Sequence, residues 1–158
     1  MLFRSISIDS IFQNKSGKEP RQRAIELANT LGIESPHGPS FDDPDEFVRV
    51  SAIRSFADRF PLDTVLSFSL AESSVVPDQT LAKFIQMARE DKSALVRLTL
   101  ASTLQRLPTK HRPALAAALL SHAEDANDHN MPFMIWYGLI PVALKDPAAL
   151  VPLAAEAK

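Results

Sequence analysis

Histidines and carboxylates gather just ahead of the chain's only Trp and Tyr, in "SHAEDANDHNMPFMIWYGL" (Ser121 to Leu139). These residue types can hold a metal ion or exchange protons, so His122, Asp125 and His129 could serve a metal-assisted hydrolase. The spacing argues against this, because the two histidines lie seven residues apart with a helix break expected between them. His122 also falls on the apolar face of its expected helix. We favour a corner between two helices, whose acidic residues gain from the dipole of the following helix.

Other constellations are weaker. "SPHGPS" places His37 among serines without an orienting acid, and "ESPHGPSFDDPDE" lacks the spacing of a calcium loop. "TKHRP" (Thr109 to Pro113) is interpreted as a solvated basic loop. The sequence therefore predicts no catalytic residue, no metal ligand and no cofactor.

Composition restricts the classes of function. The 158 residues include no cysteine, which excludes disulfides, a thiol nucleophile and haem attachment through Cys-x-x-Cys-His. The net charge is −2 and the basic residues are scattered, so we expect no nucleic-acid partner. No apolar run approaches the roughly 18 residues that span a bilayer, and the N-terminus lacks the pattern of a signal peptide. The compartment stays open.

The chain reads as a series of short helices. Apolar residues recur at three-and-four spacing, and we expect no strand. The stripes that predict helices are Ala24, Ile25, Ala28 and Leu31; Val48, Ala52, Ile53, Phe56 and Phe60; Leu62, Val65, Leu66 and Leu70; Leu81, Phe84, Ile85 and Ala88; Leu95, Leu98, Ala101 and Leu104; Leu115, Ala118, Leu119 and His122; and Ile135, Trp136, Leu139 and Ile140. Pro61 should end the second of these helices, and Pro141 should kink or end the last.

An internal repeat favours a helical solenoid over a globular bundle. "DPDEFVRVSAIRSF" from Asp43 and "DKSALVRLTLASTL" from Asp91 share Asp-x₄-Val-Arg, and "NDHNMPFMIWYGLI" from Asn127 fits more loosely. The anchors are spaced near the roughly 40-residue period of HEAT-type units. We predict an all-α, right-handed α-α superhelix of three to four HEAT-like or armadillo-like pairs over residues 41–158, with a variable cap over residues 1–40.

Four residues are candidates for an interaction surface. The repeat aspartate can cap its helix, and Arg49 and Arg97 can reach an acidic residue of a neighbouring unit, so a structural role is favoured for both arginines over contact with a partner. Trp136 and Tyr137 are adjacent on one helix and point about 100° apart. Core packing is favoured, with one of the two filling the core between repeats and the other able to approach the surface. An aromatic exposed on a concave face would mark the centre of a contact surface.

Three segments carry a family resemblance: "DDPDEFVRVSAIRSF", "SALVRLTLASTLQRLP" and "LLSHAEDANDHNMPFMIWYGLIPV". In this order they resemble the HEAT-like repeat region of large bacterial proteins described as membrane-bound dehydrogenases. In that family a propeller like that of quinoprotein sugar dehydrogenases precedes the repeats, and a cytochrome c segment follows them. The resemblance covers roughly Phe41 to Lys158, where the family's quinone-binding and haem-binding residues have no counterparts.

The function expected from these observations is that of a non-catalytic scaffold or protein-interaction module. By resemblance it is a segment of a multidomain protein with an exported context. Its partners would be a neighbouring domain, another protein, or a second copy bound through the apolar face of Pro147 to Ala157. The metal-assisted hydrolase remains the alternative.

Overall fold

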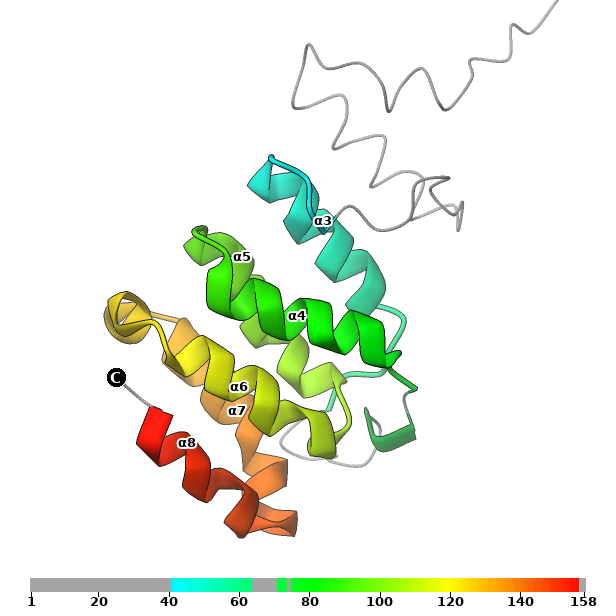
Figure 1. The fold of residues 1–158 in the computed structure, drawn as a ribbon. Coiled ribbons are helices and arrows are strands. Elements are labelled where there is room, and N and C mark those ends of the chain that lie inside the picture. The colour runs from blue at the N-terminus through cyan, green and yellow to red at the C-terminus, as the bar shows by residue number, and fades with distance from the viewer. Residues whose placement is uncertain (1–40, 64–70, 74, 157–158) are drawn as a thin grey trace, which may run out of the picture. The chain divides into compact units, whose positions relative to one another are not determined.

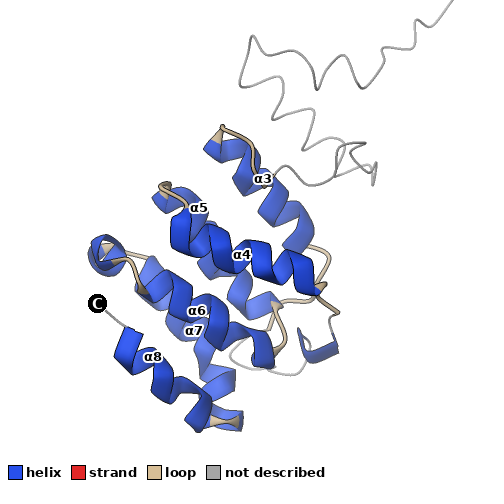
Figure 2. Cartoon of the chain, viewed as in Figure 1, coloured by secondary structure: helices blue, strands red, loops and turns tan. Residues whose placement is uncertain are grey.

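The described part of the protein is entirely helical. The computed structural model describes residues 41–63, 71–73 and 75–156, which form six α-helices with 3-10 turns and loops between them and no strand (Figure 2). This confirms the all-α class. The chain divides into two compact units, Met1–Ser55 and Phe56–Lys158. The expected N-terminal cap over residues 1–40, and residues 64–70 of the expected third helix, lie outside the described residues.

The first described helix, α3 (Glu46–Ala57), follows the predicted stripe. Val48, Ala52 and Ile53 are buried along it, and the helix ends before Pro61 as expected. Its last turn carries Phe56, whose ring meets Phe60 edge-on at a centroid distance of 5.2 Å.

The second unit arranges its helices in two layers. Three helices, α4 (Asp78–Glu90), α6 (Arg112–Leu120) and α8 (Val151–Glu156), lie side by side, with α6 in contact with both of the others (Figure 1). The other two, α5 (Ala94–Thr103) and α7 (Met131–Lys145), pack against each other in the second layer. The 3-10 turns are η1 (Ala71–Ser73), η2 (Leu104–Arg106), η3 (Thr109–His111), η4 (Ala123–Asn127) and η5 (Pro147–Leu150).

Local sequence explains where these helices begin. The Ser93 hydroxyl accepts a hydrogen bond from the Val96 amide at 3.3 Å and so caps α5. Pro77 precedes α4, and the first turns of α6 and α7 each contain a proline, which needs no hydrogen-bond acceptor at that position. Pro141 was expected to kink or end its helix, yet α7 continues through it to Lys145. Its side chain is buried, which favours the helix despite the lost backbone hydrogen bond.

The predicted stripe of α5 is confirmed at Ala101, and at Leu104 just after the helix, which are both fully buried, but not in the first half of the helix. Val96 and Leu100 are fully buried, whereas the predicted Leu95 and Leu98 are half-buried. The cause lies in the threonines of this helix. Thr99 and Thr103 are buried. Their hydroxyl groups donate hydrogen bonds to the backbone carbonyls of Leu95 and Leu100, at 2.8 and 2.7 Å, which removes most of the free-energy cost of burying them.

The C-terminal segment is partly covered by its own chain. Leu153 on α8 is buried, while Val151 is 71% exposed. No helix among the described residues combines the length and apolar character that crossing a bilayer requires.

Candidate functional site

The acidic corner lies between α6 and α7, in the turn η4. Its most buried acid, Asp125, forms a two-pronged ion pair with Arg97 of α5, with Nε–Oδ2 at 2.5 Å and Nη2–Oδ1 at 2.7 Å. The Arg97 side chain is 4% exposed and that of Asp125 9%. The hydrogen bonds that Arg97 donates to Asp125 raise the pKa of Arg97, although burial opposes the charge. Asp125 therefore holds the corner against α5.

His122 is likewise occupied by its own chain. Its Nε2 lies 2.9 Å from the Ala88 carbonyl oxygen, and its Nδ1 lies 2.9 Å from Oε1 of Glu124. Two hydrogen bonds lower the pKa of Glu124. The larger effect comes from the backbone amide of Glu124 itself and the smaller from His122. His129 is exposed. In the part of the chain that the structure describes, no three His, Cys, Asp or Glu side chains are grouped to hold a metal ion.

Asp128 organises the start of α7. Its Oδ1 accepts hydrogen bonds from the amides of Met131 at 2.7 Å and Asn130 at 2.8 Å, and these bonds lower the pKa of Asp128. The same turn precedes two other helices. Oδ1 of Asp43 accepts from the Asp45 amide at 2.9 Å, and Oδ1 of Asp91 accepts from the Ser93 amide at 3.0 Å.

This repeated turn corrects two details of the sequence repeat. The residue that occupies the aspartate position before α7 is Asp128, one residue beyond the predicted Asn127. The predicted aspartate cap is also displaced, because α5 is capped by Ser93 rather than by Asp91. Each of the three helices begins at the third residue after its aspartate.

Arg49 and Arg97 make matching contacts with the turns that precede their helices. Nη1 of Arg49 donates to the Asp43 carbonyl at 2.7 Å, and Nη1 of Arg97 donates to the Asp91 carbonyl at 2.8 Å. Both bonds reach back six residues. The structure places Arg97 in the interior, so the alternative interpretation of Arg97 as a contact with a partner is wrong. Its charge is neutralised within the chain.

A second buried ion pair was missed by the sequence analysis. Arg112 and Asp63 are 0% and 2% exposed, and Nη2 of Arg112 lies 2.5 Å from Oδ2 of Asp63. Arg112 also donates to the carbonyls of Leu107 at 2.7 Å and Gly138 at 3.0 Å. The interpretation of "TKHRP" as a solvated basic loop is therefore wrong for Arg112, which is buried and bonded to nearby Leu107 and to the distant residues Asp63 and Gly138.

The outer face of α7 carries exposed aromatic side chains. Trp136 is 57% exposed, Tyr137 43% and Phe133 56%, and Leu144 further along the helix is 70% exposed. Together with half-buried Ile140 they recur at helical spacing, and we call these five residues the α7 outer stripe. The prediction that one of Trp136 and Tyr137 fills the core is wrong, because both lie on the surface.

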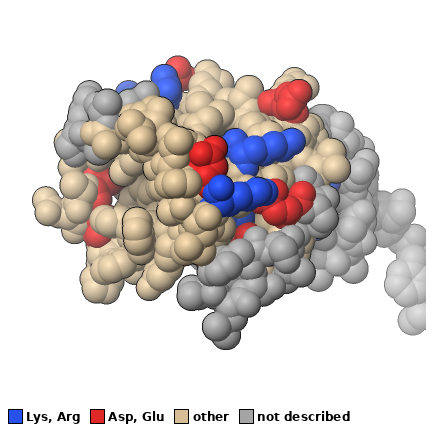
Figure 3. Space-filling view, turned by 90° about the horizontal axis from the view of Figure 1, so that it is seen from below, with Lys and Arg blue, Asp and Glu red and all other residues tan. Residues whose placement is uncertain are grey.

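The opposite face of α7 is the one that packs inside. Its buried residues are Met131, Ile135, Gly138, Leu139, Pro141 and Val142. The predicted stripe combined Ile135 and Leu139 with Trp136 and left out Phe133 and Leu144. The sequence of α7 did contain a sign of an exposed apolar surface. It carries two apolar stripes, and both cannot face the core of the chain. On the face drawn in Figure 3, the charged side chains of the described residues gather near the centre beside a broad uncharged area.

The glycine in the middle of α7 explains how closely this helix is held. A Cβ atom at Gly138 would lie 2.4 Å from Cβ of Leu104, far inside ordinary contact. The backbone of α7 is thus pressed against η2 and bonded to Arg112 at the same residue. The aromatic side chains project from a helix whose backbone is fixed on its inner side.

Comparison of the chain with family models, curated proteins and solved structures gives no match. The resemblance to the HEAT-like region of the dehydrogenase-like proteins therefore rests on the quoted residues alone.

Proposed function

We propose that this protein is a non-catalytic scaffold that binds another protein through the α7 outer stripe. One observation carries the proposal: three aromatic side chains and a leucine are 43% to 70% exposed on a single helix. Large apolar side chains that line up in this way mark interaction sites. Trp and Tyr are also enriched among the residues that dominate binding energy.

The rigidity of α7 supports this assignment. Binding costs less when the contacting side chains are already ordered, and α7 is anchored by Arg112 and by the tight packing of Gly138. The acidic corner supports a non-catalytic role, because Asp125 and His122 are used in contacts that hold helices together.

We also propose that the helices are HEAT-like units of a right-handed superhelix. The support is the shared turn before α3, α5 and α7, the matching contacts of Arg49 and Arg97, and the two layers of the second unit. By its resemblance the chain would then act as a spacer or docking segment of a dehydrogenase-like protein. The partner would be a neighbouring domain of such a protein or a separate chain.

The test is to compare binding by the wild-type chain with binding by the Trp136→Ser variant. Proteins retained from an extract of the source cells by the immobilised full chain would be identified, purified and titrated against each variant. Trp136 is the only tryptophan in the chain, so its fluorescence reports binding directly in the wild type. The matched control is Val75→Ser, which changes a side chain that is 85% exposed outside α7.

We expect the control to bind like the wild type and Trp136→Ser to lose affinity by about tenfold or more, as for an aromatic hot spot. Equal affinity of the three proteins for every purified partner would overturn the assignment of the α7 outer stripe.

A further inference from the structure

We propose that a second copy of this chain occupies the α7 outer stripe, with the two α7 helices packed antiparallel across a twofold axis. This inference rests on the proposed function, because it takes the same stripe as the binding surface. It adds the identity of the occupant and the direction in which that occupant lies.

The order of side chains along the stripe favours this pairing. Bulky Phe133, Trp136 and Tyr137 occupy its N-terminal half, and the smaller Ile140 and Leu144 occupy its C-terminal half. An antiparallel second copy places Phe133 opposite Leu144 of the partner subunit and Tyr137 opposite Ile140 of the partner subunit. Large side chains then meet small ones, which is the arrangement that fills an interface without voids or clashes.

The opposite pairing is poorer on the same grounds. Parallel helices would set the three aromatic side chains against their own copies and leave a gap at the other end. The stripe runs over twelve residues from Phe133 to Leu144, or about 16 Å at the rise of an α-helix, so such a mismatch would extend over its whole length.

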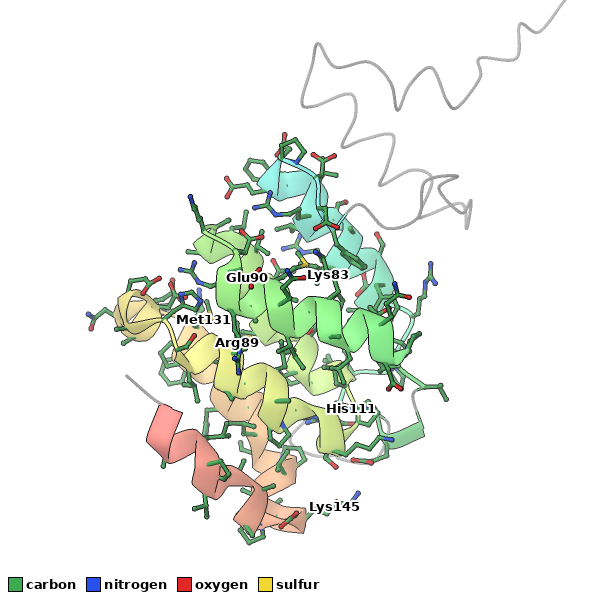
Figure 4. All side chains as sticks on the ribbon, viewed as in Figure 1. Lys83, Arg89, Glu90, His111, Met131 and Lys145 are labelled. Carbon is green, nitrogen blue, oxygen red and sulfur yellow. The ribbon has the colours of Figure 1, made fainter. Side chains whose placement is uncertain are left out.

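The charges at the ends of α7 agree with the antiparallel direction. Met131 and Lys145 mark the two ends of the helix (Figure 4). Asp128 lies exposed before the first end, and the Lys145 side chain is 63% exposed at the second. Lys145 also contacts Glu72 at 3.4 Å and is followed by Asp146, so the charge effect is small. Shape therefore decides the orientation, and charge and the antiparallel helix dipoles add to it.

The exposed area sets the expected strength. A buried aromatic side chain covers 150–250 Å², so three half-exposed aromatics and one leucine offer on the order of 400 Å² per chain. A stable interface buries about 800 Å² per partner. The stripe supplies about half of that area, which predicts a reversible dimer with a dissociation constant of about 10–100 μM rather than a permanent one.

The first measurement is sedimentation of the full chain over a concentration range that brackets about 10–100 μM. We expect a monomer–dimer equilibrium for the wild type and for the Val75→Ser control. Trp136→Ser should raise the dissociation constant by about tenfold or more. Acrylamide should quench Trp136 less at high concentration than at low concentration, because dimerisation covers it. Circular dichroism of each variant checks that it is folded.

The direction of packing is tested by cross-linking. The chain contains no cysteine, so the single substitutions Phe133→Cys and Leu144→Cys each introduce one thiol. The two proteins, one with a short tag, are mixed and oxidised with diamide, which takes up the two electrons and two protons released when a disulfide forms. We expect the mixed Phe133→Cys/Leu144→Cys disulfide to form faster than either symmetric one.

The outcomes separate this inference from the proposed function. A wild-type chain that stays monomeric well above about 100 μM overturns the dimer. If that monomer binds another protein through Trp136, the proposed function stands and the second copy fails. A dimer that Trp136→Ser leaves unchanged overturns the stripe as the dimer contact, and faster symmetric disulfides overturn the antiparallel direction.

Discussion

Replacing Arg112 with methionine tests how the second unit is held together. The substitution keeps a long apolar stem but removes the donors to Asp63 and to the carbonyls of Leu107 and Gly138. Asp63 is 2% exposed. In the variant its carboxylate would still accept the hydrogen bond from the Ala71 amide, at 2.9 Å, but it would have lost the positive charge of Arg112. A buried carboxylate left in this state is strongly unfavourable.

The expected magnitude follows from the burial of both partners. Breaking a buried ion pair by removing one member costs about 3–5 kcal/mol, against about 5–15 kcal/mol for the stability of a whole domain. With a urea dependence of about 2 kcal/mol per molar, a loss of 4 kcal/mol lowers the unfolding midpoint by about 2 M. Urea titration followed by far-ultraviolet circular dichroism measures this shift.

Two further proteins complete the experiment. In Arg112→Met/Asp63→Asn the amide oxygen can still accept from the Ala71 amide while the charge is gone, so we expect recovery of about 2 kcal/mol relative to Arg112→Met. The control, Lys145→Met, removes a partner of Glu72 that is 63% exposed and should cost less than about 1 kcal/mol. The reasoning is refuted if Arg112→Met is no more harmful than Lys145→Met, or if the second substitution restores nothing.

Three other predictions concern single residues. Gly138→Ala places a Cβ 2.4 Å from that of Leu104 and should lower the free energy of unfolding by about 1–3 kcal/mol in the same titration; an unchanged midpoint would contradict the close approach. Arg97→Lys should be destabilised nearly as much as Arg97→Met, because an ammonium group cannot reproduce the two-pronged contact with Asp125, and full stability of the lysine variant would argue against that geometry. Burial, with the neighbouring lysine, lowers the pKa of His111, so the unfolded chain takes up the proton more readily and stability should fall as the pH drops below about 6.5. Thermal unfolding of His111→Gln between pH 8 and pH 5 should show a flatter pH dependence than the wild type, and identical slopes would rule this effect out.

The positions of the helices could be predicted because their signals are local. Periodic apolar residues and nearby prolines placed α4 and α6 closely, and the expected corner between α6 and α7 is present as η4. The buried face of α5 could not be placed as well. Its sequence, "ALVRLTLAST", offers apolar residues on several faces, and the buried threonines satisfy their hydroxyls within the helix. Periodicity cannot choose among such faces.

The buried ion pairs show a different limit. Arg97 was expected to pair with an acidic residue, and Asp125, 28 residues along the chain, is its partner. The sequence pattern predicted an acidic partner for Arg97 without saying which residue it would be. Arg112 belongs to no such pattern, and Asp63 is 49 residues away from it. A short basic segment looks solvated when its counter-charge is distant in sequence.

The same limit applied to α7, where tertiary contacts decide which of two apolar stripes is exposed. Gly138 lets the helix approach η2, and Arg112 bonds to the carbonyl of that same residue. These two contacts fix the rotation of α7 about its axis, because turning it would drive larger side chains into Leu104. Once the rotation is fixed, Trp136 and Tyr137 must face outward. Arg112 therefore links the buried ion pair with Asp63 to the orientation of α7, and local sequence alone does not reveal which stripe of that helix is exposed.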